Sequence, residues 1–494
     1  MGNVSRPFAG LFNVAGNTHV YVVIGMLLLA PCLIGAMTIL GGIVVPLVLI
    51  GLSLGTIYLI LVFKQPFLGV VSILFIGFFE WAFTRELVEV PMYVIDAMTV
   101  ATWAAALGVS KSTPFTFRGN DLLIVLLIWT CWSVLMVLSP SASIAGWIRE
   151  LRVGVLLPFL VVSLGFAVIE THRQLDCFLA LSILFSLIGA LNGIKQLHIG
   201  LSPGEQAFLD DGGEITHVLF GQLRVFSFYS DAGQFGASQA QFALMCFVLF
   251  FGKFTWWKRM LLLVFAGVLF YGMLISGTRG ALFALLAGGV VAIFLSKKLI
   301  YMLSGAFVLL LFVGFLKFTY IGNTNYSIYR LRTALDFEDA SLNVRLVNQE
   351  RLHAYLNTRP FGDGLGTIGY NGVKYNPGTY LASVAPDSYW VKVWAMYGIV
   401  GFTVWFSMMM YILGRGCGIV WAIRHAGLRI KLLALTAGYA GIFVCSYGNE
   451  VMNYPPSSYV MYLSWVFIFL GPRFDQYLSE KEQGEKVKVR NYAV

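Results

Sequence analysis

Charged side chains are scarce in this sequence: they make up 12% of the residues, whereas hydrophobic residues make up 58% and the mean hydropathy is +0.79. Soluble globular domains carry about twice this share of charge, roughly 25%. The balance excludes a soluble domain and predicts an integral membrane protein whose surroundings are the lipid bilayer. The net charge of +9 does not indicate a nucleic-acid partner, because Lys and Arg occur in twos and threes between apolar runs and form no basic stripe.

The sequence also lacks the motifs of most soluble enzymes. No GxxxxGK[ST], GxGxxG, HExxH or GxSxG pattern lies in a suitable context, which argues against nucleotide-dependent and common hydrolytic chemistry. The cysteines lie in or at the ends of apolar runs, so we expect neither a disulfide framework nor a metal site. They are Cys32, Cys131, Cys177, Cys246, Cys417 and Cys445. No cleavage site follows the first apolar run, and we expect that run to insert the chain.

What the sequence has in abundance is apolar runs long enough to cross the hydrocarbon, for which ~20 helical residues suffice. They lie near 20–40, 43–63, 67–83, 91–109, 122–138, 153–169, 177–199, 234–252, 260–275, 281–296, 299–318, 388–414, 432–450 and 454–471. We therefore expect an all-α polytopic membrane protein with roughly 12 to 14 transmembrane helices. Its expected parts are a transmembrane bundle at 1–318, a polar loop or lid containing helices at 319–387, further spans at 388–471 and a polar tail at 472–494.

Short loops between these runs carry positive charge in alternation. The basic loops contain Lys64, Lys111, Arg118, Arg173, Lys253, Lys258, Arg259, Lys297, Lys298, Arg415, Arg424, Arg429 and Lys431. Because cytoplasmic loops retain Lys and Arg, these loops and both termini are predicted to be cytoplasmic. The opposite side then receives the acidic segment from Glu205 to Glu214, the 319–386 loop and the arginines Arg149, Arg152 and Arg279, which contradict the charge rule and need another reason.

Two outer segments stand out. The turn Ser276-Gly277-Thr278-Arg279-Gly280 places one guanidinium at the membrane edge between two apolar runs, where a charge is commonly functional. The alternative is that Arg279 extends to the lipid headgroups. In the outer loop, 342–358 is predicted to be helical, with Arg345, Gln349 and His353 on one face. Pro360 ends it, and the glycines that follow make an adaptable turn region. The alternative is a solvated cap whose arginines pair with acidic neighbours.

The order of these features resembles the O-antigen ligase family, which includes O-antigen ligases, glycan polymerases and protein O-oligosaccharyltransferases. The likeness covers about 220 to 415 and lies in four stretches: SGTRGALFALLAG at 276–288; Arg345 ahead of Pro360-Phe361-Gly362-Asp363-Gly364-Leu365-Gly366; Ala385-Pro386-Asp387-Ser388-Tyr389-Trp390 leading to Tyr397-Gly398-Ile399-Val400-Gly401; and, more weakly, Arg224-Val225-Phe226-Ser227-Phe228. Two positions differ: Asp387 replaces the family's histidine, and Gln349 replaces its tryptophan. Ligase, polymerase and protein transferase stay open as alternatives.

The resemblance implies a metal-independent glycosyltransferase without a cofactor, acting at the periplasmic face of a bacterial inner membrane. Its donor would be a glycan on a polyprenyl diphosphate, and its acceptor a lipid A core, a growing glycan or a protein hydroxyl. The leaving diphosphate needs fixed positive charge, and guanidinium groups match phosphate oxygens well. Arg279 and Arg345 are the first candidates for that clamp, and Arg224 is the third.

The remaining candidates have weaker arguments. Asp387 is either the general base that takes the acceptor proton or the N-cap of the helix that follows. Arg149 and Arg152 are candidates for binding the diphosphate or headgroups, and Gln349, His353, Gly364 and Gly366 for lining the substrate site. We expect the membrane carboxylates Glu80 and Asp96 to act in helix packing.

Two other classes remain. A transporter or flippase for lipid-linked or anionic substrates would also have many spans, but transporters often have paired halves around a midplane site, and no repeat is visible here. An assembly scaffold without chemistry is distinguished by whether purified protein releases polyprenyl diphosphate. The sugar and the acceptor cannot be read from these residues.

Overall fold

The computed structural model describes residues 44–87, 93–109, 120–219, 221–336, 340–384, 386 and 388–492. The chain forms two compact units, residues 1–65 and residues 66–494. The described part of the first unit is one apolar helix, α2 (Val44–Lys64). The predicted run at 20–40 lies outside the described residues.

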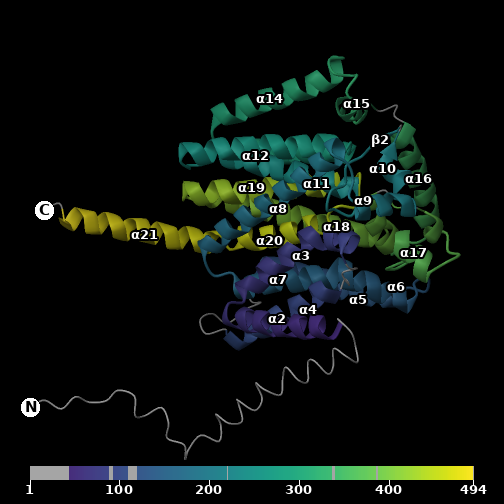
Figure 1. The fold of residues 1–494 in the computed structure, drawn as a ribbon, viewed down its shortest axis with the longest axis horizontal. Helices are drawn as coiled ribbons and strands as arrows, with labels where there is room; N and C mark the ends of the chain where they lie inside the picture. Colours follow the sequence, from purple (N-terminus) through teal and green to yellow (C-terminus); the bar gives the residue numbers. More distant parts are fainter. Residues whose placement is uncertain are drawn as a thin grey trace, which may run out of the picture. The chain divides into compact units, whose positions relative to one another are not determined.

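The second unit is almost entirely helical, as predicted (Figure 1). Its longer helices are α3 (Phe67–Glu86), α4 (Tyr93–Val109), α5 (Asp121–Leu135), α7 (Leu157–Val168), α8 (His172–His198), α11 (Ala232–Phe250), α12 (Trp256–Ile275), α13 (Arg279–Leu295), α14 (Leu299–Phe318), α16 (Ala340–Leu356), α18 (Tyr389–Ala422), α19 (Ala426–Cys445), α20 (Ser457–Phe469) and α21 (Gly471–Tyr492). Across the described residues of both units, eight helical stretches are long and apolar enough to cross a membrane, and four shorter apolar helices accompany them. This confirms an all-α polytopic membrane protein.

Short elements connect these helices. They are α6 (Ile144–Leu151), α9 (Pro203–Phe208), α10 (Glu214–His217), α15 (Tyr326–Thr333), α17 (Gly369–Tyr375) and four single turns, η1 (Met136–Leu138), η2 (Arg152–Leu156), η3 (Leu209–Gly213) and η4 (Leu381–Ser383). The strands β1 (Val218–Leu219) and β2 (Gln222–Leu223) pair antiparallel, with Val218 opposite Leu223. α6, η2 and α7 run on as one helical stretch, Ile144–Val168. It begins nine residues before the predicted run at 153–169, and it therefore carries Arg149 and Arg152 on a helix.

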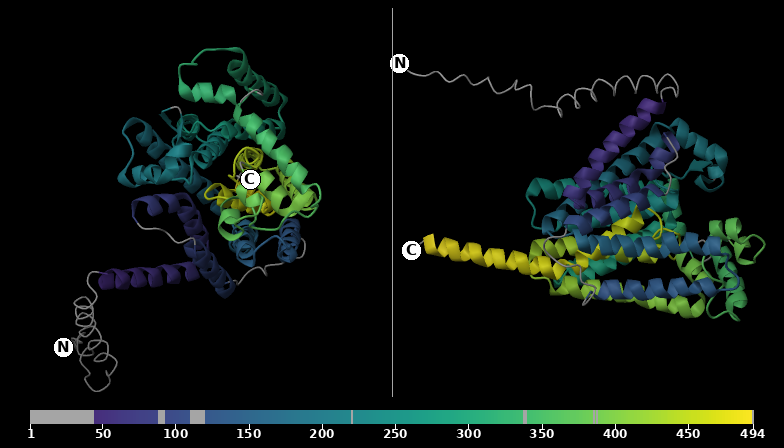
Figure 2. Two further views of the ribbon diagram at one scale, coloured as in Figure 1. Left: turned by 90° about the vertical axis from the view of Figure 1, so that its right-hand side faces the viewer. Right: turned by 90° about the horizontal axis from the view of Figure 1, so that it is seen from below.

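The loops of residues 66–494 sort into two ends. One end, called the loop end below, gathers α9, α10, the β1–β2 hairpin, α15, α16 and α17 (Figure 1). At the other end, the tail end, Arg415 pairs with Asp121 at 3.3 Å, Lys431 pairs with Asp176, and the backbone N–H of His425 donates to Asp475 at the start of α21. Figure 2 shows α21 leading away from the elements of the loop end. The predicted basic loops that carry Arg415, Arg424 and Lys431 thus lie at the tail end, and which end faces the cytoplasm stays a prediction.

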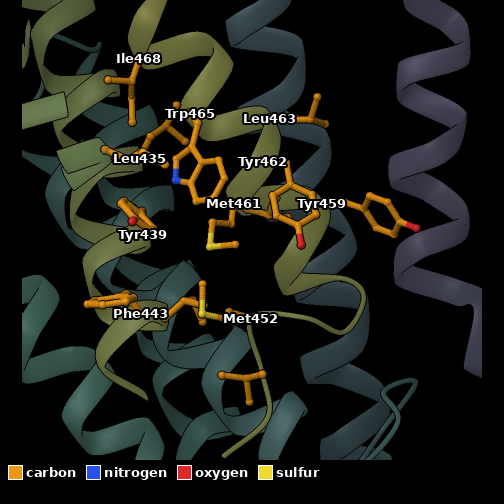
Figure 3. Packing of buried hydrophobic residues seen from close by; sticks show 14 of the residues in the cluster. Leu435, Tyr439, Phe443, Met452, Tyr459, Met461, Tyr462, Leu463, Trp465 and Ile468 are labelled. Carbon is orange, nitrogen blue, oxygen red and sulfur yellow. The ribbon is translucent and has the colours of Figure 1, made fainter. Parts of the chain in front are cut away.

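The core lies around α11, α19 and α20. α11 packs against α12, α13, α19 and α8, and nearly all its side chains are buried. Between α19 and α20, aromatic and Met side chains interlock, as Figure 3 shows for Tyr439, Phe443, Met461 and Trp465. α14 is peripheral, and Leu316 is the only residue of this fully described helix that is buried. The packed helices hold the turns of the loop end at fixed positions.

Candidate active site

The turn between α12 and α13 is fixed by its own side chains. Ser276 Oγ donates to Met273 O at 2.6 Å and accepts from the Thr278 N–H at 3.2 Å. Thr278 Oγ1 donates to Ala232 O, at the start of α11, at 2.8 Å. Gly277 has φ +57°, a left-handed conformation that side chains disfavour. Arg279 follows directly as the first residue of α13, so its backbone position is set by buried neighbours.

Two further arginines reach this turn. Arg224, just after β2, donates through Nη1 to Thr216 O at 2.9 Å and through Nη2 to Thr278 Oγ1 at 3.3 Å. Arg330, on α15, donates through Nε to Gly277 O at 3.4 Å. Burial lowers the pKa of Arg224 below its usual range, and the nearby charges of Arg330 and Arg279 lower it further. Arg224, Arg279 and Arg330 form what we call the arginine cluster.

Asp231, a carboxylate whose charge acts on Arg224, also holds the start of α11. Asp231 is the N-cap of α11, and its Oδ1 accepts from Gly233 N at 2.7 Å and Gln234 N at 3.0 Å. Its other oxygen accepts from Ser230 Oγ at 2.8 Å. Its charge raises the pKa of Arg224 but is outnumbered by the guanidinium groups. The guanidinium groups of Arg224, Arg279 and Arg330 are of the kind that match the oxygens of a phosphate.

Arg345, on α16, faces the same turn across the loop between α19 and α20. A Cβ built on Gly448 would lie 3.7 Å from Arg345 Nη1 and 3.9 Å from the Cα of Gly280. In the same loop, Tyr447 Oη donates to Gln349 Oε1 at 3.4 Å. Arg345 and Gln349 also line a small cavity against Ser388 at the start of α18. The structure thus brings together Arg224, Arg279, Arg345 and Gln349 from three separate segments.

A buried ion triad that the sequence analysis missed lies under the start of α18. Lys392 Nζ is 3.1 Å from Glu150 Oε1 and 3.3 Å from Glu450 Oε2. Asn371 donates to Glu150 Oε2 at 2.6 Å, and Asn453 donates to Glu450 Oε2 at 3.2 Å. Burial raises the pKa of Glu450, and Lys392 opposes that shift. The available signal was a lysine inside the predicted apolar run 388–414, because such charges are costly in a bilayer.

Another residue that the sequence analysis missed holds the segment that carries Arg224. Arg85, at the end of α3, donates to the carbonyl oxygens of Ser227 at 2.9 Å, Tyr229 at 2.8 Å and Ser230 at 3.1 Å. Its guanidinium also lies 4.2 Å from the ring centroid of Phe208. An arginine at a membrane edge therefore serves packing here.

Several candidate site residues lie away from the arginine cluster or make contacts that explain them structurally. Arg152 Nη2 is 2.6 Å from Asp96 Oδ2 on α4, in keeping with a packing role for Asp96. Arg149 is half-buried in the last turn of α6, and Glu80 is buried on α3. His353 is exposed on α16, with its ring centroid 6.1 Å from that of Trp394. The substrate contacts predicted for Arg149, Arg152 and His353 stay predictions.

Gly364 and Gly366 are buried where the loop meets α6 and α18. A Cβ on Gly364 would lie 2.7 Å from Ser139 Cβ, and one on Gly366 would lie 2.4 Å from Gly146 O. Gly364 N donates to Met396 O at 2.9 Å, close to the break in α18 at Gly398. Close backbone packing explains both glycines, and their predicted contact with substrate stays a prediction.

Asp387 lies outside the described residues, but the structure identifies the N-cap of the helix that follows it. Ser388 is that residue, and its Oγ accepts from Val391 N at 3.3 Å. The helix therefore does not depend on Asp387 for its cap, and the alternative reading of this aspartate is wrong. Among the described residues, no group of three or more His, Cys, Asp or Glu side chains is arranged to hold a metal ion.

Comparison with known proteins bears on the same segment. No curated protein sequence matches the chain. Residues 264–406 match the family model described as O-antigen ligase. The match contains the 276–280 turn, Arg330, Arg345, the glycine-rich segment and the start of α18, whereas Arg224 lies before it. Residues 264–406 are therefore similar to the O-antigen ligase family, which supports the resemblance seen in the sequence.

Proposed function

We propose that this protein is a glycosyltransferase that passes a glycan from a polyprenyl diphosphate to an acceptor hydroxyl at the periplasmic face of a bacterial inner membrane. The family implies glycan transfer in envelope glycan biosynthesis. The observation that carries the proposal is the gathering of Arg224, Arg279 and Arg330 around one buried turn, with Arg345 across the α19–α20 loop.

The chemistry needs such a site. The acceptor oxygen attacks the anomeric carbon, the bond from that carbon to the phosphate oxygen breaks, and the diphosphate leaves with the bonding electron pair. Fixed guanidinium groups stabilise this growing negative charge without reorganising, and they do so best where water is partly excluded. The acceptor proton goes to a base, and we assign that role to Asp387, next to the capped start of α18 and not required as its cap.

Two observations support a base close to the arginines: Asp387 is adjacent in sequence to Ser388, and Ser388 lines a small cavity together with Arg345 and Gln349. Asp387 directly precedes Ser388, so acceptor activation would take place beside Arg345. A proton acceptor next to the clamp is what an attack at the diphosphate-bearing carbon requires.

The test uses the purified full-length protein in liposomes with the lipid-linked glycan pool as donor and the envelope lipid and protein fraction of the source bacterium as acceptor. Transfer would release glycan-free polyprenyl diphosphate, which chromatography quantifies. A transporter would move the intact donor between leaflets and release none. Release by wild type but not by Arg279→Lys, with Arg424→Lys at the tail end as control, supports transfer; movement without release overturns it.

The acceptor class is separated in a deletion strain. Loss of all glycan attachment to lipid A core or to protein indicates a ligase or a protein transferase, according to which conjugate disappears. Short chains that are still attached indicate a polymerase.

A further inference from the structure

A cavity of about 510 Å³ opens at the loop end beside the arginine cluster. Its walls are the end of α8, the β1–β2 hairpin, the last residue of α12, and α15 with the segment that leads into it. Cavities that bind small ligands have volumes of about 300 to 1,000 Å³, so this one is large enough for one or more sugar rings. Neither the family match nor the proposed clamp assigns it a role.

The lining of the cavity is uncharged and mostly polar or aromatic, with three aliphatic side chains, Leu197, Leu223 and Ile275. Its side chains include Gln222, Asn323, Thr324, Ser327, Tyr326 and Tyr329, and among the described lining residues there is no Lys, Arg, Asp or Glu. Amides and hydroxyls both donate and accept hydrogen bonds, as a dense array of sugar hydroxyls requires. Tyrosine adds a flat apolar face with a polar tip, which suits the C–H faces of a pyranose. An alkyl chain would leave these polar groups unpaired, and a free anion would find no charge.

The cavity and the arginine cluster share a wall. A Cβ built on Gly277 would lie 3.7 Å from Tyr326 Cε1 and equally 3.7 Å from Arg224 Cγ. Tyr326 lines the cavity, and Arg330, one turn further along α15, donates to Gly277 O at 3.4 Å. In a glycosyl diphosphate, one oxygen joins the first sugar to the phosphorus. A diphosphate held by the arginine cluster therefore has its first sugar within a few bonds of this cavity.

Two buried polar atoms mark the shared wall. Arg224 Nε and Tyr326 Oη are buried, and within the described residues neither has a hydrogen-bond partner. Buried donors are almost always paired in proteins, so unpaired ones at a site call for a ligand. A glycosyl phosphate carries acceptor oxygens for both, since phosphate oxygens would face Arg224 and the ring or hydroxyl oxygens would face Tyr326.

From these observations we propose that the cavity is the donor glycan subsite, which binds the sugars next to the diphosphate of the lipid-linked donor. The inference rests on the proposed function and specifies it further. The arginine cluster binds the diphosphate, and the uncharged cavity beside it binds the sugar. Residues of α15 and the hairpin therefore determine the selectivity for the glycan.

The test compares Asn323→Ala and Tyr329→Ala with wild type. Both side chains line the cavity and are exposed, and Asn325 is left intact because it caps α15. We expect the KM for the extracted lipid-linked glycan to rise about tenfold in each variant, with kcat nearly unchanged, because a lost stacking or hydrogen-bonding contact has roughly this effect on affinity. Binding of glycan-free undecaprenyl diphosphate should stay at the wild-type value.

Tyr320→Ala is the matched control, because it removes an exposed tyrosine from the same loop outside the cavity. A rise in the KM for the acceptor alone would assign the cavity to the acceptor and overturn the donor assignment. Unchanged values for both substrates would show that it binds no sugar. Direct binding of the extracted donor, compared with binding of glycan-free undecaprenyl diphosphate, tests the subsite separately from the proposed function. If the wild type releases no diphosphate, the proposed function fails. A loss of affinity in Tyr329→Ala for the donor alone would still support the subsite.

Discussion

Lys392 Nζ lies 3.1 Å from Glu150 Oε1, and both side chains are only 8% exposed. This contact joins the first turn of α18 to α6, two segments far apart in sequence. With Glu450 as the second carboxylate, it ties the start of α18 to the loop that separates Arg279 from Arg345.

Lys392→Met should destabilise the protein strongly, because it leaves two buried carboxylates without their cation. Removing one partner of a buried pair typically costs about 3 to 5 kcal/mol. Thermal unfolding in detergent measures the loss. Arg415→Met is the comparison, since its pair with Asp121 is exposed and is worth less than about 1 kcal/mol. Equal shifts in the two variants would contradict a stabilising role for the triad.

Arg279→Lys and Arg345→Ala should each insert and accumulate normally but lose about a hundredfold in transfer rate, or roughly 3 kcal/mol of transition-state stabilisation. Lysine keeps the charge of Arg279 but not its planar array of donors. Single-turnover release of polyprenyl diphosphate measures this. Turnover near the wild-type level in both variants would rule out the clamp.

Substitutions at Ser388 and at Asp387 should affect different properties, the first stability and the second activity. Ser388→Ala removes the observed cap and should cost about 1 kcal/mol of stability while leaving most activity. Asp387→Asn should fold normally and be inactive, whereas Asp387→His should recover some turnover with a changed pH profile. An active Asp387→Asn would exclude the base role, and His353 would be the next residue to replace.

His217 should make the loop end sensitive to acid. Its Nδ1 lies 2.9 Å from Gly213 O, and its Nε2 accepts from Ala232 N, a neutral arrangement. Burial lowers its pKa below the ordinary value of about 6.5; Arg224 and Arg85 lower it further, and Asp231 opposes them. The unfolded chain therefore binds a proton near pH 6.5 that the folded chain does not, so stability falls as pH drops below that value.

Thermal unfolding between pH 7.5 and 5.5 tests this for His217→Gln, which should show a flatter pH dependence than wild type. His353→Gln is the control, because it removes an exposed imidazole from the same end. An unchanged slope in His217→Gln would contradict the prediction.

Sidedness can be tested with single cysteines in a cysteine-free background. Val373→Cys places a thiol on exposed α17, and Arg424→Cys places one at the tail end; Asn371 is avoided because it donates to Glu150. In intact cells, a membrane-impermeant reagent should label the first and not the second. The reverse pattern would place the arginine cluster in the cytoplasm.

Local sequence patterns predicted the helices well, because a span is defined by its own run of apolar residues. They also pointed to Arg279 and Arg345, because each lies in a local motif, and the roles of both stay predictions. The triad of Lys392, Glu150 and Glu450 was not predictable in this way, because its partners come from distant segments and neither carboxylate has a signature of its own. The close packing of Gly364 and Gly366 was not predictable either, because the sequence shows an adaptable turn but not the backbone that lies against it.

The burial of α11 bears on how the protein is made. This helix is not among the stretches that are apolar enough to cross a membrane alone, and its buried side chains include Gln234, Gln239 and Gln241. Polar side chains that face lipid are energetically costly, so the transfer of α11 alone from the translocon into the bilayer would be unfavourable. We infer that α11 remains in the translocon until α12, with which it packs, has been made, and that the two helices enter the lipid as a hairpin. Assembly of the loop end would then begin during synthesis.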